Sequence, residues 1–347
     1  MKEAIFIIQG SGKGHFSQAL TRYRQLTGAG VRVSRIYVGR SLMQQPPAYF
    51  HTAFPLQVTW FRSPDFISRA DRRGIRVGCS LLVNLLVSPL YLYSFFRLRR
   101  RLRRSAADAV FNFYDPVGAL VCRWPGRRLE RIAVGHHFYL AHPAFSFPSG
   151  FPMQRRLLRL MNRLMMHAAD RVEALSFRHA PPHEKIRVLP PLVHPALGRV
   201  TYAPGERDLC YFLTPGYVND YLAVAGTYQW KADIFTAAVQ QVTRKGNVTL
   251  YPPSLEGFRE KLSRCRRLVT TGGFETVAEA LFLGVPVFIL PARGHYEQLC
   301  NAVDAEETGL AVRLTEMGQL AEAREVVAAG GALERYREWV EFSGSNN

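Results

Sequence analysis

The chain has 347 residues, of which 48% are hydrophobic and 21% charged. This composition is typical of a globular protein, and the length allows two domains with separate cores. Five scattered cysteines include no Cys-x-x-Cys pair, which excludes a disulfide framework and a zinc ribbon and is typical of a reducing compartment. The first apolar run is five residues long, so we expect no secretory signal.

The net charge of +18 is unevenly distributed along the chain. Residues 1–200 hold 31 Lys and Arg against 9 Asp and Glu, whereas residues 201–347 hold 14 against 18. Most of the basic residues are Arg, which binds phosphate through two parallel hydrogen bonds. We therefore expect the N-terminal half to face a polyanion: nucleic acid, an anionic membrane surface or a phosphorylated acceptor. An arginine-rich genome is the alternative explanation for the preference for Arg over Lys.

Apolar runs alternate with helical stretches, which predicts a parallel α/β architecture. The expected strands are residues 3–8, 31–38, 109–113, 131–135, 208–213, 232–236, 266–270 and 286–290. Four prolines between residues 189 and 207 interrupt any regular structure there. We predict an N-terminal lobe over residues 1–190, a linker over 191–207 and a C-terminal lobe over 208–330. The segment 331–347 is predicted to be a helix that could cross back to the first lobe.

Residues 77–96 carry no charge, and an arginine cluster follows them. The cluster consists of Arg97, Arg99, Arg100, Arg101, Arg103 and Arg104. A helix lying on an anionic bilayer is the preferred interpretation; a core helix and a membrane span are the alternatives. A second helix, residues 153–168, surrounds an apolar side with arginines and either extends the same surface or packs in the core.

The motif TTGGFETVAEALFLGVPVFILPARGHYEQLCNA covers residues 270–302. Gly272 and Gly273 follow a strand and precede a helix, whose N-terminus is an anion site that Thr276 can complete. Glu279 lies one turn further on. Glu297 and Gln298 open the next helix, where they suit sugar hydroxyls. The alternative is a plain helix entry with a solvated glutamate.

This pattern of G-G-x-x-T-x-x-E-A, G-V-P and E-Q-x-x-N-A resembles the donor site of GT-B glycosyltransferases, in particular families 1 and 28. Family 28 includes the N-acetylglucosaminyltransferase that makes lipid II. The resemblance implies two Rossmann-like parallel-sheet lobes facing each other across a cleft. It places Gly272, Gly273 and Thr276 at the diphosphate, Glu279 at the ribose, and Glu297 and Gln298 at the sugar. We also assign Thr214, Gly216 and Tyr251 to the donor site, with Tyr251 near the base.

A second glycine-rich loop, GSGKGHFSQAL, covers residues 10–20. It is no P-loop because Gly14, rather than Ser or Thr, follows Lys13. It is no dinucleotide fingerprint because no acidic residue occurs between Glu3 and Asp65. The loop resembles the G-x-G-G-H loop of family 28, which implies that Gly10, Gly12, Lys13 and Gly14 face the acceptor and the donor phosphate.

His15 is the predicted general base, because a histidine titrates near neutral pH; a capping residue is the alternative. Asp115 follows the strand 109–113 and either acts as base, orients His15, or caps the helix that Pro116 begins. His136, His137 and His142 are candidate metal ligands. With no cysteine or carboxylate near them in sequence, we expect no metal and assign His137 to the acceptor site.

The sequence thus predicts a hexosyltransferase that moves a sugar from a nucleotide diphosphate sugar, UDP by resemblance, to a hydroxyl or phosphate acceptor. We expect inversion, no metal or other cofactor, and a lipid-linked acceptor of the cell envelope. The expected location is cytoplasmic, on the inner face of the cytoplasmic membrane. A nucleotide-sugar epimerase of the same fold is one alternative. A nucleic-acid-binding protein is another, although the arginines interleave with Leu and Met rather than with stacking aromatics, so we expect no nucleic acid partner.

Overall fold

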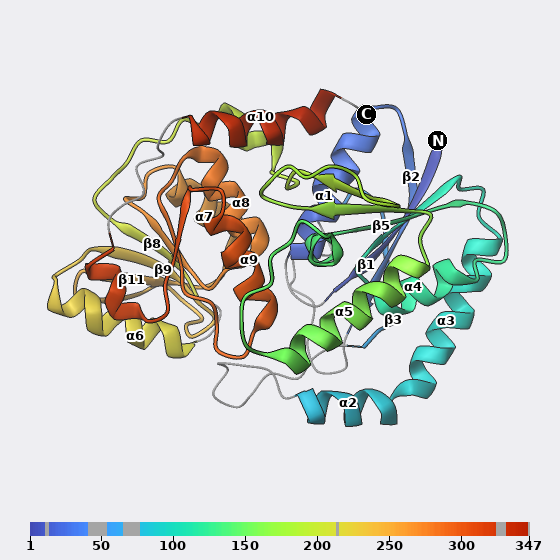
Figure 1. Ribbon diagram of the computed structural model, residues 1–347, viewed down its shortest axis with the longest axis horizontal. Coiled ribbons are helices and arrows are strands. Elements are labelled where there is room, and N and C mark those ends of the chain that lie inside the picture. Colours follow the sequence, from blue (N-terminus) through green and yellow to red (C-terminus); the bar gives the residue numbers. More distant parts are fainter. Residues whose placement is uncertain (11–13, 41–53, 65–76, 213–214, 324–330, 346–347) are drawn as a thin grey trace. The chain divides into compact units, whose positions relative to one another are not determined.

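The computed structural model describes residues 1–10, 14–40, 54–64, 77–212, 215–323 and 331–345. They form two compact units: the first comprises the described residues up to Leu192 together with the end of the chain from Phe342, and the second runs from Val193 to Glu341. Each unit contains one seven-stranded sheet with helices packed on it (Figure 1). The predicted fold class, two parallel α/β lobes, is therefore confirmed.

The sheet of the N-terminal unit is parallel throughout, with the order β3-β2-β1-β4-β5-β6-β7. Its strands are β1 (Glu3–Gln9), β2 (Arg32–Arg40), β3 (Val58–Arg62), β4 (Ala109–Phe113), β5 (Glu130–Gly135), β6 (Arg171–Leu175) and β7 (Ile186–Leu189). Central strands such as β1 and β4 are buried along almost their whole length, because helices cover both faces of a parallel sheet.

Five α-helices of the N-terminal unit lie in the described residues. They are α1 (Gly14–Gly28), α2 (Val77–Leu86), α3 (Ser88–Arg103), α4 (Pro116–Arg123) and α5 (Pro152–His167). The uncharged run 77–96 is divided between α2 and α3 at Val87, and Pro89 stands in the first turn of α3, where proline is tolerated. In the part of the chain that the structure describes, no helix is long and apolar enough to cross a membrane.

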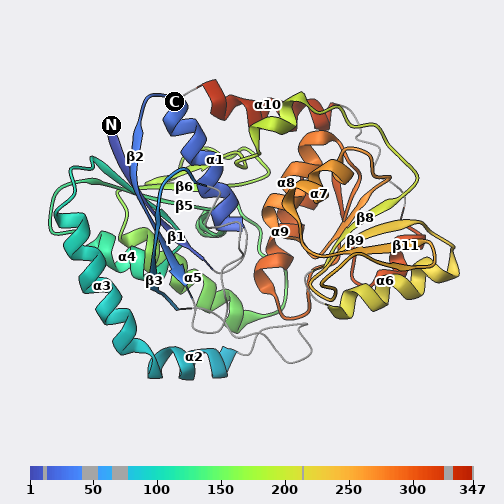
Figure 2. The same ribbon diagram turned by 180° about the vertical axis from the view of Figure 1, so that it is seen from behind.

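The sheet of the C-terminal unit has the order β10-β11-β9-β8-β12-β13-β14 and is parallel except for the β10–β11 hairpin. Its strands are β8 (Asp208–Tyr211), β9 (Ala232–Phe235), β10 (Thr243–Lys245), β11 (Val248–Tyr251), β12 (Leu268–Thr270), β13 (Val287–Ile289) and β14 (Ala311–Arg313). Its helices are α6 (Pro215–Thr227), α7 (Leu255–Leu262), α8 (Phe274–Leu283), α9 (Tyr296–Glu306) and α10 (Ala332–Ser345), seen from behind in Figure 2.

A buried ion pair ties two central strands of this unit together at their amino ends. Arg267, just before β12, binds Asp208, the first residue of β8, at 3.0 Å, and both side chains are almost fully buried. The Tyr221 hydroxyl donates to the same carboxylate at 2.8 Å. The opposite, carboxyl edge of the sheet is therefore the edge at which loops are available for a site.

Candidate active site

Three helices begin at the carboxyl edge of the C-terminal sheet. The strands β8, β12 and β13 are neighbours in the sheet, and α6, α8 and α9 follow them in the chain. Each helix N-terminus carries free amide groups and a partial positive charge, so adjacent N-termini at one edge suit an anion. In open parallel sheets this edge is where ligands bind.

The glycine pair 272–273 forms the turn from β12 into α8. Gly272 has φ of +93°, a conformation that favours glycine, and its carbonyl accepts a hydrogen bond from Asn301 Nδ2 at 3.1 Å. Gly273 is the N-cap residue and supplies no side-chain cap. A Cβ at Gly273 would meet only Thr276 Oγ1, at 3.9 Å. The turn thus leaves the amide end of α8 open beside a hydroxyl, as the sequence predicts for a phosphate site.

Glu279 lies on α8 as expected, but it is not solvated: it is 5% exposed and forms an ion pair with Arg259 of α7. Arg259 Nε donates to both carboxylate oxygens at 3.2 Å, and its Nη2 donates to Oε1. A carboxylate has about four lone-pair sites, so acceptor capacity for ribose hydroxyls is left. The simple alternative of a solvated glutamate is wrong.

Gln298 and Tyr217 hold the loop that follows β13. Gln298 Oε1 accepts from the Ala292 amide at 3.1 Å, and the Tyr217 hydroxyl accepts from the Arg293 amide at 2.8 Å. The side-chain carbonyl of Gln298 therefore orders the loop that follows β13. Glu297 is half-buried in the first turn of α9, and Gly216 lies in the first turn of α6. Thr214 lies outside the described residues.

Tyr251 ends β11, two strands away from β8. Its ring stacks on Phe235 with the centroids 5.2 Å apart, and Lys261 Nζ lies 4.6 Å from its centroid. Lys261 also pairs with Asp233 at 3.1 Å. Tyr251 thus belongs to an ordered aromatic cluster, and its contact with a nucleotide base stays a prediction.

In the N-terminal unit, four rings gather where α1 and the segment after β5 meet the carboxyl end of β4. His15, in the first turn of α1 and 8% exposed, lies 5.6 Å from Tyr114, 5.9 Å from His136 and 5.3 Å from His137 between ring centroids. Gln18 Nε2 donates to His136 Nδ1 at 3.3 Å. The structure therefore brings His15 and His137 together, as an acceptor site requires.

Asn162 is a site residue that sequence reasoning missed. It lies on α5 with no exposed surface, its Oδ1 accepts from the Tyr114 hydroxyl at 2.6 Å, and its Nδ2 donates to the His137 carbonyl at 2.6 Å. Tyr114 stacks on His137 at 4.0 Å and has φ of +58°, a left-handed conformation that is costly for a bulky residue. Asn162 thus fixes the ring cluster. The one signal in the sequence is an asparagine inside an amphipathic helix.

Asp115 is the N-cap of α4: its Oδ1 accepts from the Gly118 amide at 2.7 Å, and the residue has no exposed surface. Burial raises the pKa of this carboxyl to about 7, against the lowering effect of the backbone hydrogen bonds. This arrangement favours the structural interpretation of Asp115 over that of a base that reaches the acceptor.

Gly10 and Gly39 pack the ends of β1 and β2 closely. A Cβ at Gly10 would clash with the Gly39 carbonyl, and one at Gly39 would clash with Asp115 Oδ2. The Gly10 amide donates to the Gly39 carbonyl at 2.8 Å. Gly10 is therefore required by packing, whatever it faces. Gly14 begins α1, and Gly12 and Lys13 lie outside the described residues.

His142 does not join His136 and His137 as a metal ligand. Its Nδ1 accepts from the Ala144 amide at 3.1 Å, and its Nε2 donates to the Pro181 carbonyl at 3.0 Å. Both ring nitrogens are thus engaged by the backbone, which removes the three-histidine set.

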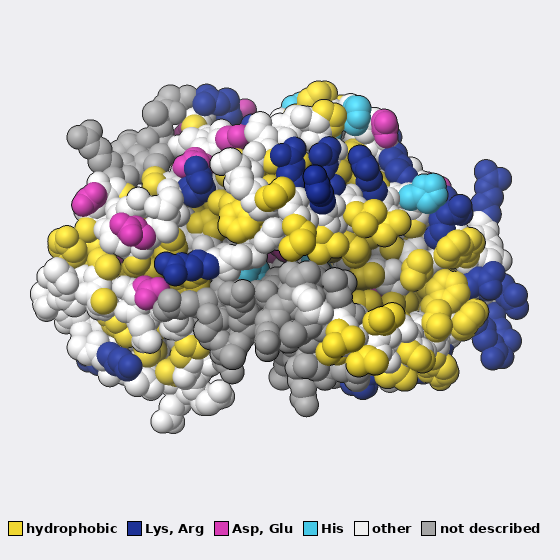
Figure 3. Space-filling model, turned by 60° about the horizontal axis from the view of Figure 1, so that its bottom comes forward, with side chains coloured by type: hydrophobic (Ala, Val, Ile, Leu, Met, Phe, Trp, Pro, Cys, Tyr) yellow, Lys and Arg dark blue, Asp and Glu magenta, His cyan; other side chains and the backbone are white. Residues whose placement is uncertain are grey.

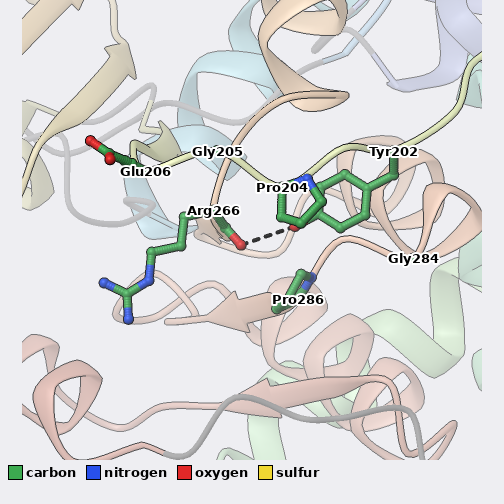
Figure 4. A pocket seen from close by; sticks show the side chains of 7 residues that line it. All are labelled: Tyr202, Pro204, Gly205, Glu206, Arg266, Gly284 and Pro286. Carbon is green, nitrogen blue, oxygen red and sulfur yellow. Dashed lines mark hydrogen bonds between the residues drawn. The ribbon is translucent and has the colours of Figure 1, made fainter.

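A pocket in the C-terminal unit lies at the wrong edge of the sheet for the donor (Figure 4). The residues that line it are Tyr202, Pro204, Gly205, Glu206, Arg266, Gly284 and Pro286. They come from segments that precede β8, β12 and β13, so the pocket is at the amino edge. The Tyr202 hydroxyl donates to the Arg266 carbonyl at 3.1 Å, which ties two of these segments together.

The fold is that of known sugar-transferring enzymes of the GT-B class. It is similar over 99% of this chain and 95% of the other to the glycotransferase of kitacinnamycin and to CalG4, the calicheamicin glycosyltransferase, each with a TM-score of 0.61 and 16% identity. It is similar over 100% of this chain and 96% of the other to UGT2 of Phytolacca americana, with a TM-score of 0.61 and 12% identity. At these identities the likeness shows the fold.

The sequence itself settles the family. Residues 4–326 match the profile of glycosyl transferase family 1, so the chain belongs to that family. No curated protein matches the sequence. The finer resemblance to the enzyme that makes lipid II stays a hypothesis.

Proposed function

We propose that the protein transfers a hexosyl group from a UDP-sugar to an acceptor hydroxyl or phosphate, with inversion and without a metal. The observation that carries the donor half is the Gly272-Gly273 turn, which leaves the amide end of α8 open next to Thr276. UDP is supported by structural neighbours that hold it: Phytolacca UGT2 is complexed with UDP-2-fluoroglucose, and LpCGTa with UDP.

In the proposed reaction His15 takes the proton of the acceptor hydroxyl. The oxygen forms a bond to the anomeric carbon while the bond from that carbon to the diphosphate oxygen breaks, and the electron pair leaves on the diphosphate. Charge that develops on the leaving group is stabilised by the amide end of α8 and by the Thr276 hydroxyl. Gln298, whose carbonyl is held by Ala292, directs its amide group to the sugar.

The acceptor is the less constrained half of the proposal. Phytolacca UGT2 is complexed with pterostilbene, a small molecule, so a lipid-linked acceptor rests on this chain's own surface alone. The support is the excess of arginine in residues 1–200, which suits a phosphorylated acceptor. A place on the inner face of the cytoplasmic membrane belongs to the same proposal.

The test is a titration of the protein with UDP, GDP, ADP and their sugar conjugates, comparing two glycine variants. Gly273→Val adds a side chain in open space at the proposed phosphate site. It should weaken binding at least about tenfold, because the side chain blocks the approach of the diphosphate to amides whose hydrogen bonds to a charged group are worth roughly 1.5–3 kcal/mol each. Gly226→Val, at the exposed far end of α6 with nothing within 4 Å, is the matched control and should bind as the wild type does.

Equal affinity of the two variants would overturn the donor site. Incubation with the bound sugar nucleotide alone distinguishes the remaining activities. If an epimer forms without an acceptor, the protein is an epimerase rather than a transferase. If the nucleotide sugar is stable alone and is consumed only when an acceptor is present, the result supports transfer.

A further inference from the structure

The N-terminal unit exposes an unusual number of large apolar side chains on three helices. Leu86 of α2 is 72% exposed, Tyr93 of α3 is 64% exposed and Leu164 of α5 is 60% exposed. Together, the exposed members on these helices are Leu82, Leu85, Leu86, Leu90, Leu92, Tyr93, Phe96, Met153, Leu160 and Leu164. Soluble proteins scatter such residues singly, and a contiguous set indicates an interaction surface. We call this set the apolar face.

The charged side chains of these three helices and of α4 are all positive. The helices α2, α3, α4 and α5 contain ten arginines and no lysine, aspartate or glutamate. In the right half of Figure 3, hydrophobic side chains gather over the N-terminal unit, with Lys and Arg side chains along their margins. Arg100 of α3 and Arg156 and Arg163 of α5 are exposed. Two of the arginines predicted for this surface serve the fold instead: Arg99 donates to the Trp124 carbonyl at 2.7 Å, and Arg101 lies over the Tyr37 ring.

We propose that the apolar face with its arginines docks on the surface of an anionic lipid bilayer. Leucine, tyrosine and phenylalanine side chains enter the interface, and the exposed arginines reach lipid phosphates. The side chains of the apolar face are not part of the core, because they are exposed on the N-terminal unit. A second copy of the chain is disfavoured as the occupant, because it would bring a second all-arginine margin against the first.

The docking face shares a helix with the ring cluster. On α5, Leu160 and Leu164 point outward, whereas Asn162 between them is fully buried and holds Tyr114 and the His137 carbonyl. An acceptor anchored in the bilayer would therefore meet the protein at the helix that orders its proposed acceptor site. This last step rests on the proposed transfer activity; the docking itself does not.

The test measures cosedimentation of the full chain with vesicles of neutral phosphatidylcholine and with vesicles that also contain phosphatidylglycerol. We expect binding to the anionic vesicles that falls in 1 M salt, where the Debye length drops to about 3 Å. Each arginine near the surface contributes about a fivefold factor in partitioning. The variant Arg100→Ser, Arg156→Ser, Arg163→Ser should therefore bind on the order of 100-fold more weakly.

Matched controls keep the result specific. Arg244→Ser, Lys245→Ser, Arg264→Ser removes the same charge from exposed positions of the C-terminal unit and should bind as the wild type does. Leu86→Ser with Leu164→Ser tests the apolar contribution against Val242→Ser with Leu255→Ser, which are exposed apolar residues of the other unit. Circular dichroism checks that each variant is folded.

Three outcomes would overturn the docking proposal: no binding to anionic vesicles, equal binding to neutral ones, or equal loss in the charge-matched control. A stable dimer that Leu86→Ser with Leu164→Ser dissociates would also overturn it, in favour of a second copy. Titration of the same variants with UDP separates the two proposals, because loss of nucleotide binding bears on the donor site and leaves the vesicle result standing.

Discussion

The two units have the same kind of sheet, but they build their candidate sites from different material. In the C-terminal unit the site is mainly backbone: a glycine turn and the amide end of α8, supported by Asn301 and Gln298. In the N-terminal unit the site is made of side chains, with the rings of His15, Tyr114 and His137 packed together. A site built from backbone amides requires glycines at a fixed spacing in the sequence. A ring cluster requires only that its side chains lie close together in the folded protein.

The units also differ in what their surfaces expose. The N-terminal unit carries the apolar face and its arginines, whereas the sequence of residues 201–347 has slightly more acidic than basic residues. In our proposals the N-terminal unit faces an anionic lipid surface, and a single turn of the C-terminal unit binds the anionic nucleotide. Each of the following changes tests one side of it.

The largest expected effect is that of His15→Ala. Turnover should fall about 100- to 10,000-fold, the usual contribution of a general base, while the affinity for the nucleotide sugar stays unchanged. Steady-state kinetics and a separate nucleotide titration measure the two quantities. His167→Ala, exposed at the end of α5, is the control and should keep full turnover.

If the turnover of His15→Ala stays within a few-fold of the wild type, the general base does not lie in the ring cluster. If Asp115→Asn then lost turnover while its fold stayed intact, Asp115 would be the base despite its burial. If both variants stayed active, neither residue would be the base.

Glu279→Ala should cost both stability and donor affinity. The substitution leaves Arg259 without its partner, and breaking a buried pair costs about 3–5 kcal/mol. Urea unfolding measures the loss of stability, and a UDP titration measures the donor. In Arg259→Ala the carboxylate keeps its place, so donor affinity should fall less than in Glu279→Ala. Equal donor affinity in Glu279→Ala and wild type would show that the glutamate is structural only.

Asn162→Ala should act through the ring cluster. Two buried hydrogen bonds are lost, each leaving a polar group unsatisfied at about 1–3 kcal/mol. We expect a lower kcat with an unchanged KM for the donor, because Asn162 positions the acceptor side. Tyr114→Phe removes only the hydroxyl and should give a smaller change of the same kind. A raised donor KM with normal kcat would contradict this role.

The last expected effect is a pH dependence of stability. Because burial raises the pKa of Asp115 to about 7 from its usual 3.8, the native carboxyl holds a proton that the unfolded chain releases between those values. The free energy of unfolding contributed by this residue therefore falls as pH rises from about 4 to 7. Asp115→Asn keeps a capping acceptor and should remove that slope in urea unfolding.

Asp108→Asn is the opposite control. Backbone hydrogen bonds from Lys2 and Glu3 lower the pKa of Asp108, so its contribution to stability is lost as pH falls rather than as it rises. A slope that Asp115→Asn leaves unchanged would mean that the native carboxyl is ionised.

The sequence predicts the fold well where strands are buried and continuous. The runs 3–8 and 109–113 correspond closely to β1 and β4. Six of the described strands were not predicted: β3, β6, β7, β10, β11 and β14. The strand β10 is three partly exposed residues, Thr-Arg-Lys, and β6 carries Arg171 and Glu173 within its apolar pattern. Short edge strands and charged strand residues depend on tertiary contacts that leave no periodicity.

The candidate sites show the same limit. The turn at Gly272 and Gly273 was predicted because helix entries of this kind require glycine at fixed spacing. The ion pair of Glu279 with Arg259 was not predicted, because Arg259 is 20 residues away in the sequence and lies on another helix. The role of Asn162 was not predicted either, because its two hydrogen-bond partners come from two other segments of the chain.

The most direct test of the central claim is a crystal structure of the protein with bound UDP. We predict diphosphate oxygens within hydrogen-bond distance of the amides that begin α8 and of Thr276 Oγ1, with Glu279 still paired with Arg259 and facing the ribose. UDP bound elsewhere, for example in the pocket of Tyr202 and Arg266 at the amino edge of the sheet, would contradict it.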